Sequence, residues 1–138
     1  NKVDERLKIY TDLDNIEKEE ELQEFKKQLL DRFGPLPKEV VELMNGLRLR
    51  WMAKRLGFER IILKNKKMKC YFIENQESYY YQTNIFTTIL QYVRKFPDQL
   101  NLKQSKKHLI IIFDGIKSMH EAKERLTHVE GYLKGEVV

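Results

Sequence analysis

The sequence contains a single cysteine, Cys70, and only three prolines and six glycines among its 138 residues. One cysteine excludes a disulfide framework and a cysteine-based zinc site, and it suits a reducing cytoplasm. No apolar run approaches the roughly 20 residues of a membrane-spanning helix. Neither Gly-x-x-x-x-Gly-Lys-Ser/Thr nor Gly-x-Gly-x-x-Gly occurs, which argues against nucleotide chemistry within this chain. We therefore expect no enzyme activity, no catalytic residues, no bound cofactor, no metal site and no membrane partner.

The composition that remains is typical of one folded domain, with 41% hydrophobic and 34% charged residues. A chain of this length buries a sizeable core. Because it opens at Asn1 without an initiator methionine or a signal-peptide pattern, we expect it to be a fragment of a longer protein.

The formal net charge of +5 is unevenly distributed along the chain. Residues 1–42 hold 8 Lys/Arg and 12 Asp/Glu, a net charge of −4, whereas residues 43–138 hold 18 and 9, a net charge of +9. This asymmetry indicates two surfaces with different partners. The basic part leaves open a nucleic-acid-binding module as an alternative function.

Helical periodicity dominates the acidic part of the chain. It predicts a short helix over residues 3–13, with Leu7, Ile9, Tyr10 and Leu13 partly buried, and then a longer amphipathic helix. The spacing of Asp14 and Glu17 is that of a capping box, which predicts where the second helix begins. Its apolar face consists of Leu22, Phe25, Leu29 and Phe33. Its opposite face is a mostly acidic stripe of Glu17, Glu21, Glu24, Gln28 and Asp31. From periodicity alone, the stripe is most simply a solvated face.

A sharp corner is predicted after this helix. Gly34 can adopt the positive φ that ends a helix, and Pro35 prevents the helix from continuing. Pro37 stands where a new helix would begin and loses nothing there by lacking an N–H group. The structural motif of the corner is therefore Phe33, Gly34, Pro35, Leu36 and Pro37.

Beyond the corner, the pattern predicts a helix over residues 40–56, ended by Gly57, and then a change to strand periodicity. The expected elements are strands at 60–63 and 68–73 around a turn at Asn65-Lys66, a helix at 83–96 capped by Thr83, strands at 100–103 and 109–113, and a last helix opened by the Ser118/Glu121 capping box. The predicted fold class is α+β: an N-terminal helical hairpin packed with a ββαββα half that contains a small, mostly antiparallel sheet.

Several residue groups could in principle bind a metal or a nucleic acid, but a structural role is the favoured interpretation for each. His120, Glu124 and His128 have a spacing that could hold a metal, but a fourth ligand is missing. His108 has no obvious partner, and Asp31 and Asp114 are lone carboxylates at the ends of elements. The tyrosines of residues 79–81, with Lys64, Lys66, Lys67 and Lys69, mix aromatic and basic residues as single-strand binders do. A lysine-rich hairpin and a loop of partly packed tyrosines is the favoured interpretation, and a helix-turn-helix is disfavoured because both helices look too long.

The corner also carries a family resemblance. The string Asp31-Arg32-Phe33-Gly34-Pro35-Leu36-Pro37, followed by Leu47-Arg48 and Ala53-Lys54-Arg55-Leu56-Gly57, resembles the C-terminal domain of bacterial transcription-repair coupling factors. Arg6-Leu7 and Tyr10 match the start of that domain. The likeness is specific over residues 6–63, and beyond them only the order of elements agrees. On this basis residues 1–14 are a helix leading in from the preceding region, and residues 15–138 are the domain, with a helical half (15–57) and a ββαββα half (58–138).

The resemblance implies a regulatory role in a bacterial, cytoplasmic protein. The parent family are ATP-driven DNA translocases that bind double-stranded DNA, displace stalled RNA polymerase and recruit the repair protein UvrA. Their ATP- and magnesium-dependent motor lies upstream of this domain. The terminal domain docks on the UvrB-like N-terminal module of the same chain and masks the surface that UvrA must bind. It is thus expected to be autoinhibitory and not itself an enzyme.

The resemblance also implies a partner interface of Glu24, Gln28, Asp31 and Arg32. The family uses acidic residues at positions 28 and 31, and this chain has Gln28 and Asp31 there. A carboxylate pairs with arginine more strongly than a neutral amide does. We therefore expect a weaker clamp in this chain, or one that uses Glu24 one helical turn earlier.

Overall fold

The computed structural model describes residues 2–136 and has the α+β architecture that the sequence predicts. The chain forms two compact units, residues 1–48 and residues 49–138. The helices are α1 (Lys2–Asp14), α2 (Glu19–Phe33), α3 (Lys38–Leu56), the short 3-10 helix η1 (Tyr79–Gln82), α4 (Asn84–Lys95) and α5 (Met119–Leu133). The strands are β1 (Phe58–Lys64), β2 (Lys67–Phe72), β3 (Leu100–Gln104) and β4 (Leu109–Asp114). None of the helices among these residues is long and apolar enough to span a membrane.

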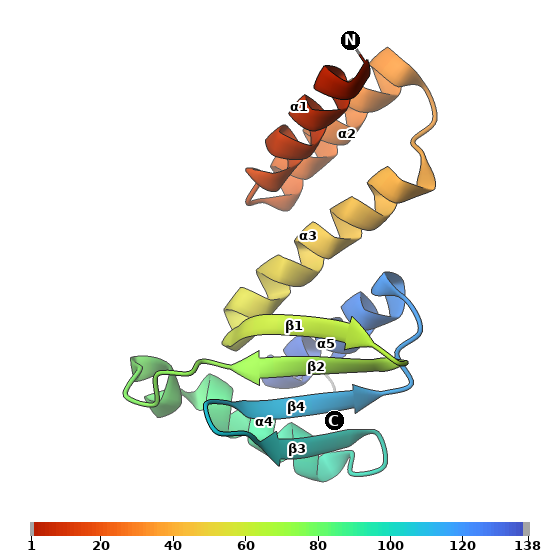
Figure 1. Cartoon of the computed structure of the whole chain (residues 1–138). Helices are drawn as coiled ribbons and strands as arrows, with labels where there is room; N and C mark the ends of the chain where they lie inside the picture. Colours follow the sequence, from red (N-terminus) through yellow and green to blue (C-terminus); the bar gives the residue numbers. More distant parts are fainter. Residues whose placement is uncertain (1, 137–138) are drawn as a thin grey trace. The chain divides into compact units, whose positions relative to one another are not determined.

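In the first unit, α1 and α2 lie side by side and run in opposite directions (Figure 1). Leu22 and Leu29 of α2 are buried, as its apolar periodicity predicts. Of the four residues of α1 expected to be partly buried, Leu13 is buried and Ile9 is half-buried, whereas Leu7 and Tyr10 are 57% and 39% exposed. The expectation is therefore confirmed for Ile9 and Leu13 and wrong for Leu7 and Tyr10, because α1 turns only Leu13 fully inward.

The predicted capping box at Asp14 and Glu17 is also wrong. The residue before α2 is Lys18, whose side chain makes no capping hydrogen bond. The chain turns between the two helices instead: Ile16 is buried, and its N–H group donates to the Leu13 carbonyl over 3.1 Å. Because Ile16 is buried in this turn, the residues that the sequence pattern assigns to the start of α2 lie before the helix.

The corner between α2 and α3 is built as predicted. Gly34 has a φ of 77°, and its N–H group donates to the Leu30 carbonyl over 2.9 Å, which ends α2. The Pro37 carbonyl accepts hydrogen bonds from the N–H groups of Val40 and Val41, which opens α3 at the next residue. Two prolines flanking this turn fix its backbone, because each has only one accessible range of φ.

The second unit is built on an antiparallel sheet with strand order β1-β2-β4-β3. Helices α4 and α5 cover one face of this sheet (Figure 1). Side chains alternate along each strand, so every second residue faces the helices. The inward set of β2 is Met68, Cys70 and Phe72, all fully buried. They join a core with residues of α3, α4, α5 and β4, including Leu56, Ile89, Leu126, Ile111 and Phe113.

The tyrosines of η1 are part of this packing. The Tyr80 hydroxyl donates to the Leu56 carbonyl over 2.5 Å, and the Tyr81 hydroxyl donates to the Ile73 carbonyl. Gly57, with a φ of 90°, lies so close beneath the Tyr80 ring that an added Cβ would overlap the ring atoms. Tyr79 is different, since it is 75% exposed. The cluster is therefore mainly structural, as the plainer interpretation proposed.

The two predicted caps in this unit have different outcomes. The Ser118 hydroxyl accepts a hydrogen bond from the Glu121 N–H group over 3.1 Å, which confirms the start of α5. Thr83 does precede α4, but its hydroxyl donates to the Tyr80 carbonyl over 2.6 Å and makes no capping bond to the helix. The side chain of Thr83 thus fastens η1 and not the helix that follows.

Candidate functional site

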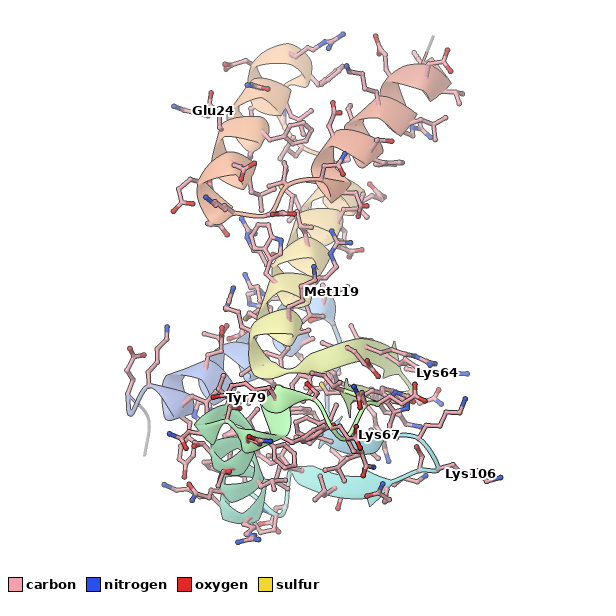
Figure 2. The ribbon with its side chains drawn as sticks, turned by 90° about the vertical axis from the view of Figure 1, so that its left-hand side faces the viewer. Glu24, Lys64, Lys67, Tyr79, Lys106 and Met119 are labelled. Atoms are coloured by element: carbon pink, nitrogen blue, oxygen red, sulfur yellow. The ribbon has the colours of Figure 1, made fainter. Side chains whose placement is uncertain are left out.

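The predicted interface residues of α2 lie on its surface. Glu24, Gln28 and Asp31 are all exposed, and Figure 2 shows Glu24 on the outer side of the helix. They follow one another at helical spacings of four and three residues, so they form one stripe. Among the described residues 2–136, neither Glu24 nor Asp31 forms an ion pair with another part of this chain. The stripe therefore offers free carboxylates to a partner.

A shallow hollow of about 460 Å³ extends this stripe toward the end of α1. Glu24 and Gln28 lie on its wall, and Asp31 lies outside it. Its remaining lining residues are Asp12, Ile16, Glu20, Glu21 and Phe25. Four of the seven lining residues are carboxylates and none is basic, so the hollow is complementary to a cationic side chain.

Arg32 lies differently from the other three predicted interface residues. Its guanidinium is 3.5 Å from the Glu5 carboxylate of α1 and lies over the Phe33 ring, 5.1 Å from the ring centroid. Both partners belong to the first unit. Arg32 thus supports the pairing of α1 with α2, and its role toward a partner remains a prediction.

The motif at the corner lines a second hollow, of about 510 Å³. Phe33, Leu36 and Pro37 form part of its wall, and Phe33 is 48% exposed. Sequence periodicity placed Phe33 on the buried stripe of α2. Phe33 is the last residue of α2, at the end of the apolar stripe, and it is only half-buried there.

The start of α2 is held by a two-pronged ion pair. The Arg48 guanidinium donates from Nε and Nη2 to the two carboxylate oxygens of Glu19, over 2.8 and 2.9 Å. Because this geometry is bidentate, it fixes direction as well as distance. The bond fastens α2 to the first part of α3 and so positions the acidic stripe within the unit.

The histidines predicted as possible metal ligands on α5 do not converge. His120 lies 3.1 Å from Glu124, whereas His128 Nδ1 lies 2.6 Å from the Tyr92 hydroxyl. His128 also packs edge-on against Phe96. The spacing of four residues therefore reflects an exposed pair and a separate packed histidine.

A different cluster, which the sequence does not reveal, joins three strand ends of the second unit. The ligand atoms of Glu59, Glu74 and His108 lie within 4.8 Å of one another. His108 Nε2 is 2.7 Å from a Glu59 oxygen, and the same oxygen accepts from the Glu74 N–H group over 2.9 Å. An irregularity in β1 between Phe58 and Arg60 turns Glu59 toward these partners. Three ligands of this kind could hold a cation. The hydrogen bonds join Glu59 to the His108 ring and to the Glu74 backbone, so they account for the approach of two of the three ligand groups.

The lone cysteine is part of the core. Cys70 is fully buried, and burial raises the pKa of its thiol well above the usual range. A thiol held protonated in an apolar core is not a nucleophile. The same cause, burial, raises the pKa of the Tyr80 hydroxyl. Both groups are structural.

The fold and its surfaces together describe an α+β domain in which a helical unit with an exposed acidic stripe precedes a sheet unit. Residues 1–83 match the family model of the TRCF domain. This chain belongs to the TRCF domain family, the terminal domain of transcription-repair coupling factors, which confirms the resemblance found in the sequence.

Individual relatives agree with this assignment. The chain is 39% identical over 59 residues to the transcription-repair-coupling factor of Escherichia coli, covering 43% of this chain and 5% of that protein. It is 26% identical over 126 residues to that of Borreliella burgdorferi, covering 91% of this chain and 10% of that protein. The chain thus spans about a tenth or less of the length of these relatives.

The fold agrees with a solved structure as well. The crystal structure of a C-terminal domain of transcription-repair coupling factor superposes with a TM-score of 0.66, covering 93% of this chain and 78% of that one. The sequence identity is 18%, so this likeness shows the shared fold.

Proposed function

We propose that this domain is the autoinhibitory, regulatory part of an ATP-dependent DNA translocase that acts in transcription-coupled nucleotide excision repair. It docks on the UvrB-like N-terminal module of its own chain and masks the surface that UvrA binds. The observation that carries this proposal is the exposed stripe of Glu24, Gln28 and Asp31, whose carboxylates have no ion-pair partner among residues 2–136.

The chemistry of the stripe suits a lock that must open. Exposed ion pairs contribute only about 0.2–1 kcal/mol each, because water and salt screen them. A few such pairs alone would give a weak interface. It forms mainly because both surfaces belong to one chain, which raises their effective concentration. A ligand that binds the open form better than the closed form then shifts the equilibrium toward release.

The longer protein supplies the rest of this mechanism. The relatives are about ten or more times the length of this chain, so the ATP- and magnesium-dependent motor belongs to the remainder of the proposed parent. RNA polymerase and double-stranded DNA are the proposed partners of that motor. UvrA is an indirect partner of this domain, because the two compete for one surface.

The test is a titration of the chain against the separately prepared UvrB-like module, with UvrA as competitor. We expect saturable binding that UvrA displaces. The variant Glu24→Gln/Asp31→Asn removes two carboxylate charges and should weaken binding about 2- to 25-fold, which corresponds to about 0.2–1 kcal/mol for each pair.

The matched control is Glu42→Gln, which removes an exposed carboxylate from α3 instead of α2. It should leave the affinity unchanged. The proposal fails if the wild-type chain does not bind the module, if UvrA does not compete, or if the control weakens binding as much as the stripe variants do.

A further inference from the structure

The face of the sheet turned away from α4 and α5 carries cations around an apolar centre of Ile62, Ile110 and Ile112. Because side chains alternate, the inward position of Met68 and Cys70 sends Lys67 and Lys69 to the opposite face. The strand pairings carry this alternation to the neighbouring strands. The cations of this face and of the two turns at its ends, here called the basic sheet face, are Arg60, Lys64, Lys66, Lys67, Lys69, Lys103, Lys106 and Lys107.

These cations run from one end of the sheet to the other. Lys64 and Lys67 pair beside the β1–β2 turn, and Lys69 pairs with Ile62 farther along. Arg60 and Lys103 lie in the next row, on the two edge strands. Lys106 is in the β3–β4 turn at the far end, and Figure 2 shows it on the same side of the sheet as Lys64 and Lys67. Neighbouring strands are about 4.8 Å apart, so the charges form an extended band and not a single point.

Two features of the β1–β2 turn place charge there against local preference. Lys64 and Lys67 are direct cross-strand partners, and like charges in that arrangement repel. Lys66 has a φ of 60° after Asn65 with a φ of 54°, which are the signs of a type I′ turn. Glycine is strongly preferred at the position of Lys66 in such a turn. Lysine thus occurs at two positions where local backbone and charge preferences disfavour it. This indicates that the positive charge at the turn has a function.

Few carboxylates neutralise this band. Asp114 lies 3.6 Å from Lys67, and Glu59 is engaged by His108 at the opposite end. Within the described part of the chain, Lys64, Lys69 and Lys103 form no ion pair. The face therefore has a net positive charge that favours a polyanion.

The aromatic residues show which kind of polyanion fits. Tyr71 is the aromatic residue in the outward row of β2, and the Arg60 guanidinium covers its ring at 4.9 Å from the centroid. The His108 ring also meets it edge-on, at 5.4 Å between centroids. Because this ring is occupied and Tyr80 is packed inside, the face lacks the free stacking platform that single strands need. A row of cations without an aromatic ring for bases to stack on is suited to contact the phosphates of a duplex, whose bases are already paired and stacked.

We propose that the basic sheet face binds the sugar–phosphate backbone of double-stranded DNA without reading its bases. The choice of DNA over an RNA duplex rests on the proposed function, whose parent moves along DNA. The binding surface itself is inferred from the structure of the second unit.

The first measurement is the affinity of the whole 138-residue chain for a fluorescent mixed-sequence DNA duplex as a function of salt. If three to five phosphates are contacted, a plot of the logarithm of the association constant against the logarithm of the salt concentration should have a slope of about −2.7 to −4.5. Single-stranded DNA and an RNA duplex of the same sequence are the comparison probes. Stronger binding to the single strand, or binding to RNA duplex alone, would overturn the proposal.

The variant Lys66→Gly separates function from structure. Glycine fits the positive φ without strain, so the melting temperature should rise. The loss of one phosphate contact should nevertheless weaken binding and make the salt slope shallower by about 0.9. A higher melting temperature with unchanged DNA affinity would exclude Lys66 from the binding surface.

The double variant Lys64→Gln/Lys69→Gln tests the band directly, and its salt slope should be shallower by about 1.8. Arg94→Gln/Lys134→Gln is the matched control, since it removes the same charge from exposed positions at the ends of α4 and α5. It should leave the slope unchanged. If both variants lost the same DNA affinity, the binding would depend on net charge alone, and the proposed binding surface would be wrong. Failure here leaves the docking assay unaffected, because that assay contains no DNA.

Discussion

The two units of this domain differ in how much of their apolar surface they bury. Among the described residues, the first unit contributes six buried hydrophobic side chains and the second unit contributes eighteen. Of the nine large hydrophobic side chains that are exposed between residues 2 and 136, seven belong to the first unit. The second unit thus buries most of its large apolar side chains, whereas the first unit exposes many of its own.

Their charges differ as well. The first unit presents acidic side chains along α2, and the second presents cations along one face of its sheet. A densely packed body can carry repelling charges such as Lys64 and Lys67, because its core outweighs their small cost. A lightly packed unit is better suited to an interface that forms and dissolves. The buried core is therefore concentrated in the second unit, whereas each unit carries a charged surface of its own.

The largest expected effect comes from disturbing the packing of the second unit at Gly57. Gly57→Ala forces a Cβ into the Tyr80 ring and also strains a φ of 90°. We expect a loss of about 3 kcal/mol or more in the free energy of unfolding, measured with urea.

Gly115→Ala is the control for that substitution. Its φ of 76° is similarly strained, but nothing lies within 4 Å of the added Cβ. It should cost only about 1–2 kcal/mol. Equal costs at the two glycines would show that the Tyr80 ring moves aside freely.

A second substitution tests whether the first unit can be loosened alone. Leu22 is fully buried, and Leu22→Ala should cost the first unit about 2–4 kcal/mol by leaving a cavity. Hydrogen exchange should then accelerate in α1 and α2 while the strands remain protected. Uniform acceleration through β2 and β4 would show that the two units unfold together.

Alkaline pH should act on the second unit. Burial raises the pKa of Cys70 and of Tyr80 in the folded state above their ordinary values of about 8.5 and 10. The unfolded chain therefore loses these protons first as pH rises. Stability is full below about pH 8 and falls progressively above it.

Urea unfolding at a series of alkaline pH values measures this loss. Tyr80→Phe should be less stable at neutral pH, because it removes the bond to the Leu56 carbonyl, but its stability should fall less steeply above pH 10. An identical slope in this variant would show that the phenol does not contribute.

The smallest expected effect concerns the acidic stripe. Gln28→Glu places a carboxylate one turn from Glu24 and on the wall of the acidic hollow. It should strengthen docking to the UvrB-like module about 2- to 5-fold, since a charged acceptor binds arginine better than an amide. The titration described above measures it, and an unchanged affinity would count against position 28 as a contact.

Local sequence signals predicted the elements whose causes are local. Gly34 and Pro37 set the corner, and Ser118 with Glu121 set the start of α5. The start of α2 was mispredicted because the burial of Ile16, a tertiary effect, outweighs the capping pattern at Asp14. The acidic stripe was visible from periodicity, but its hollow depends on how α1 packs beside it.

By itself, the sequence determined the α+β class, the order of the elements, the acidic and basic halves and the family. These features follow from periodicity, turn residues and composition, which act over a few residues at a time. Only the tertiary structure placed the Tyr80 ring over Gly57, joined Glu59 to His108, and gathered lysines from three strands and two turns on one face. The physical reason is that strand order, register and the irregularity in β1 bring together residues far apart in the chain, and no local pattern encodes those pairings.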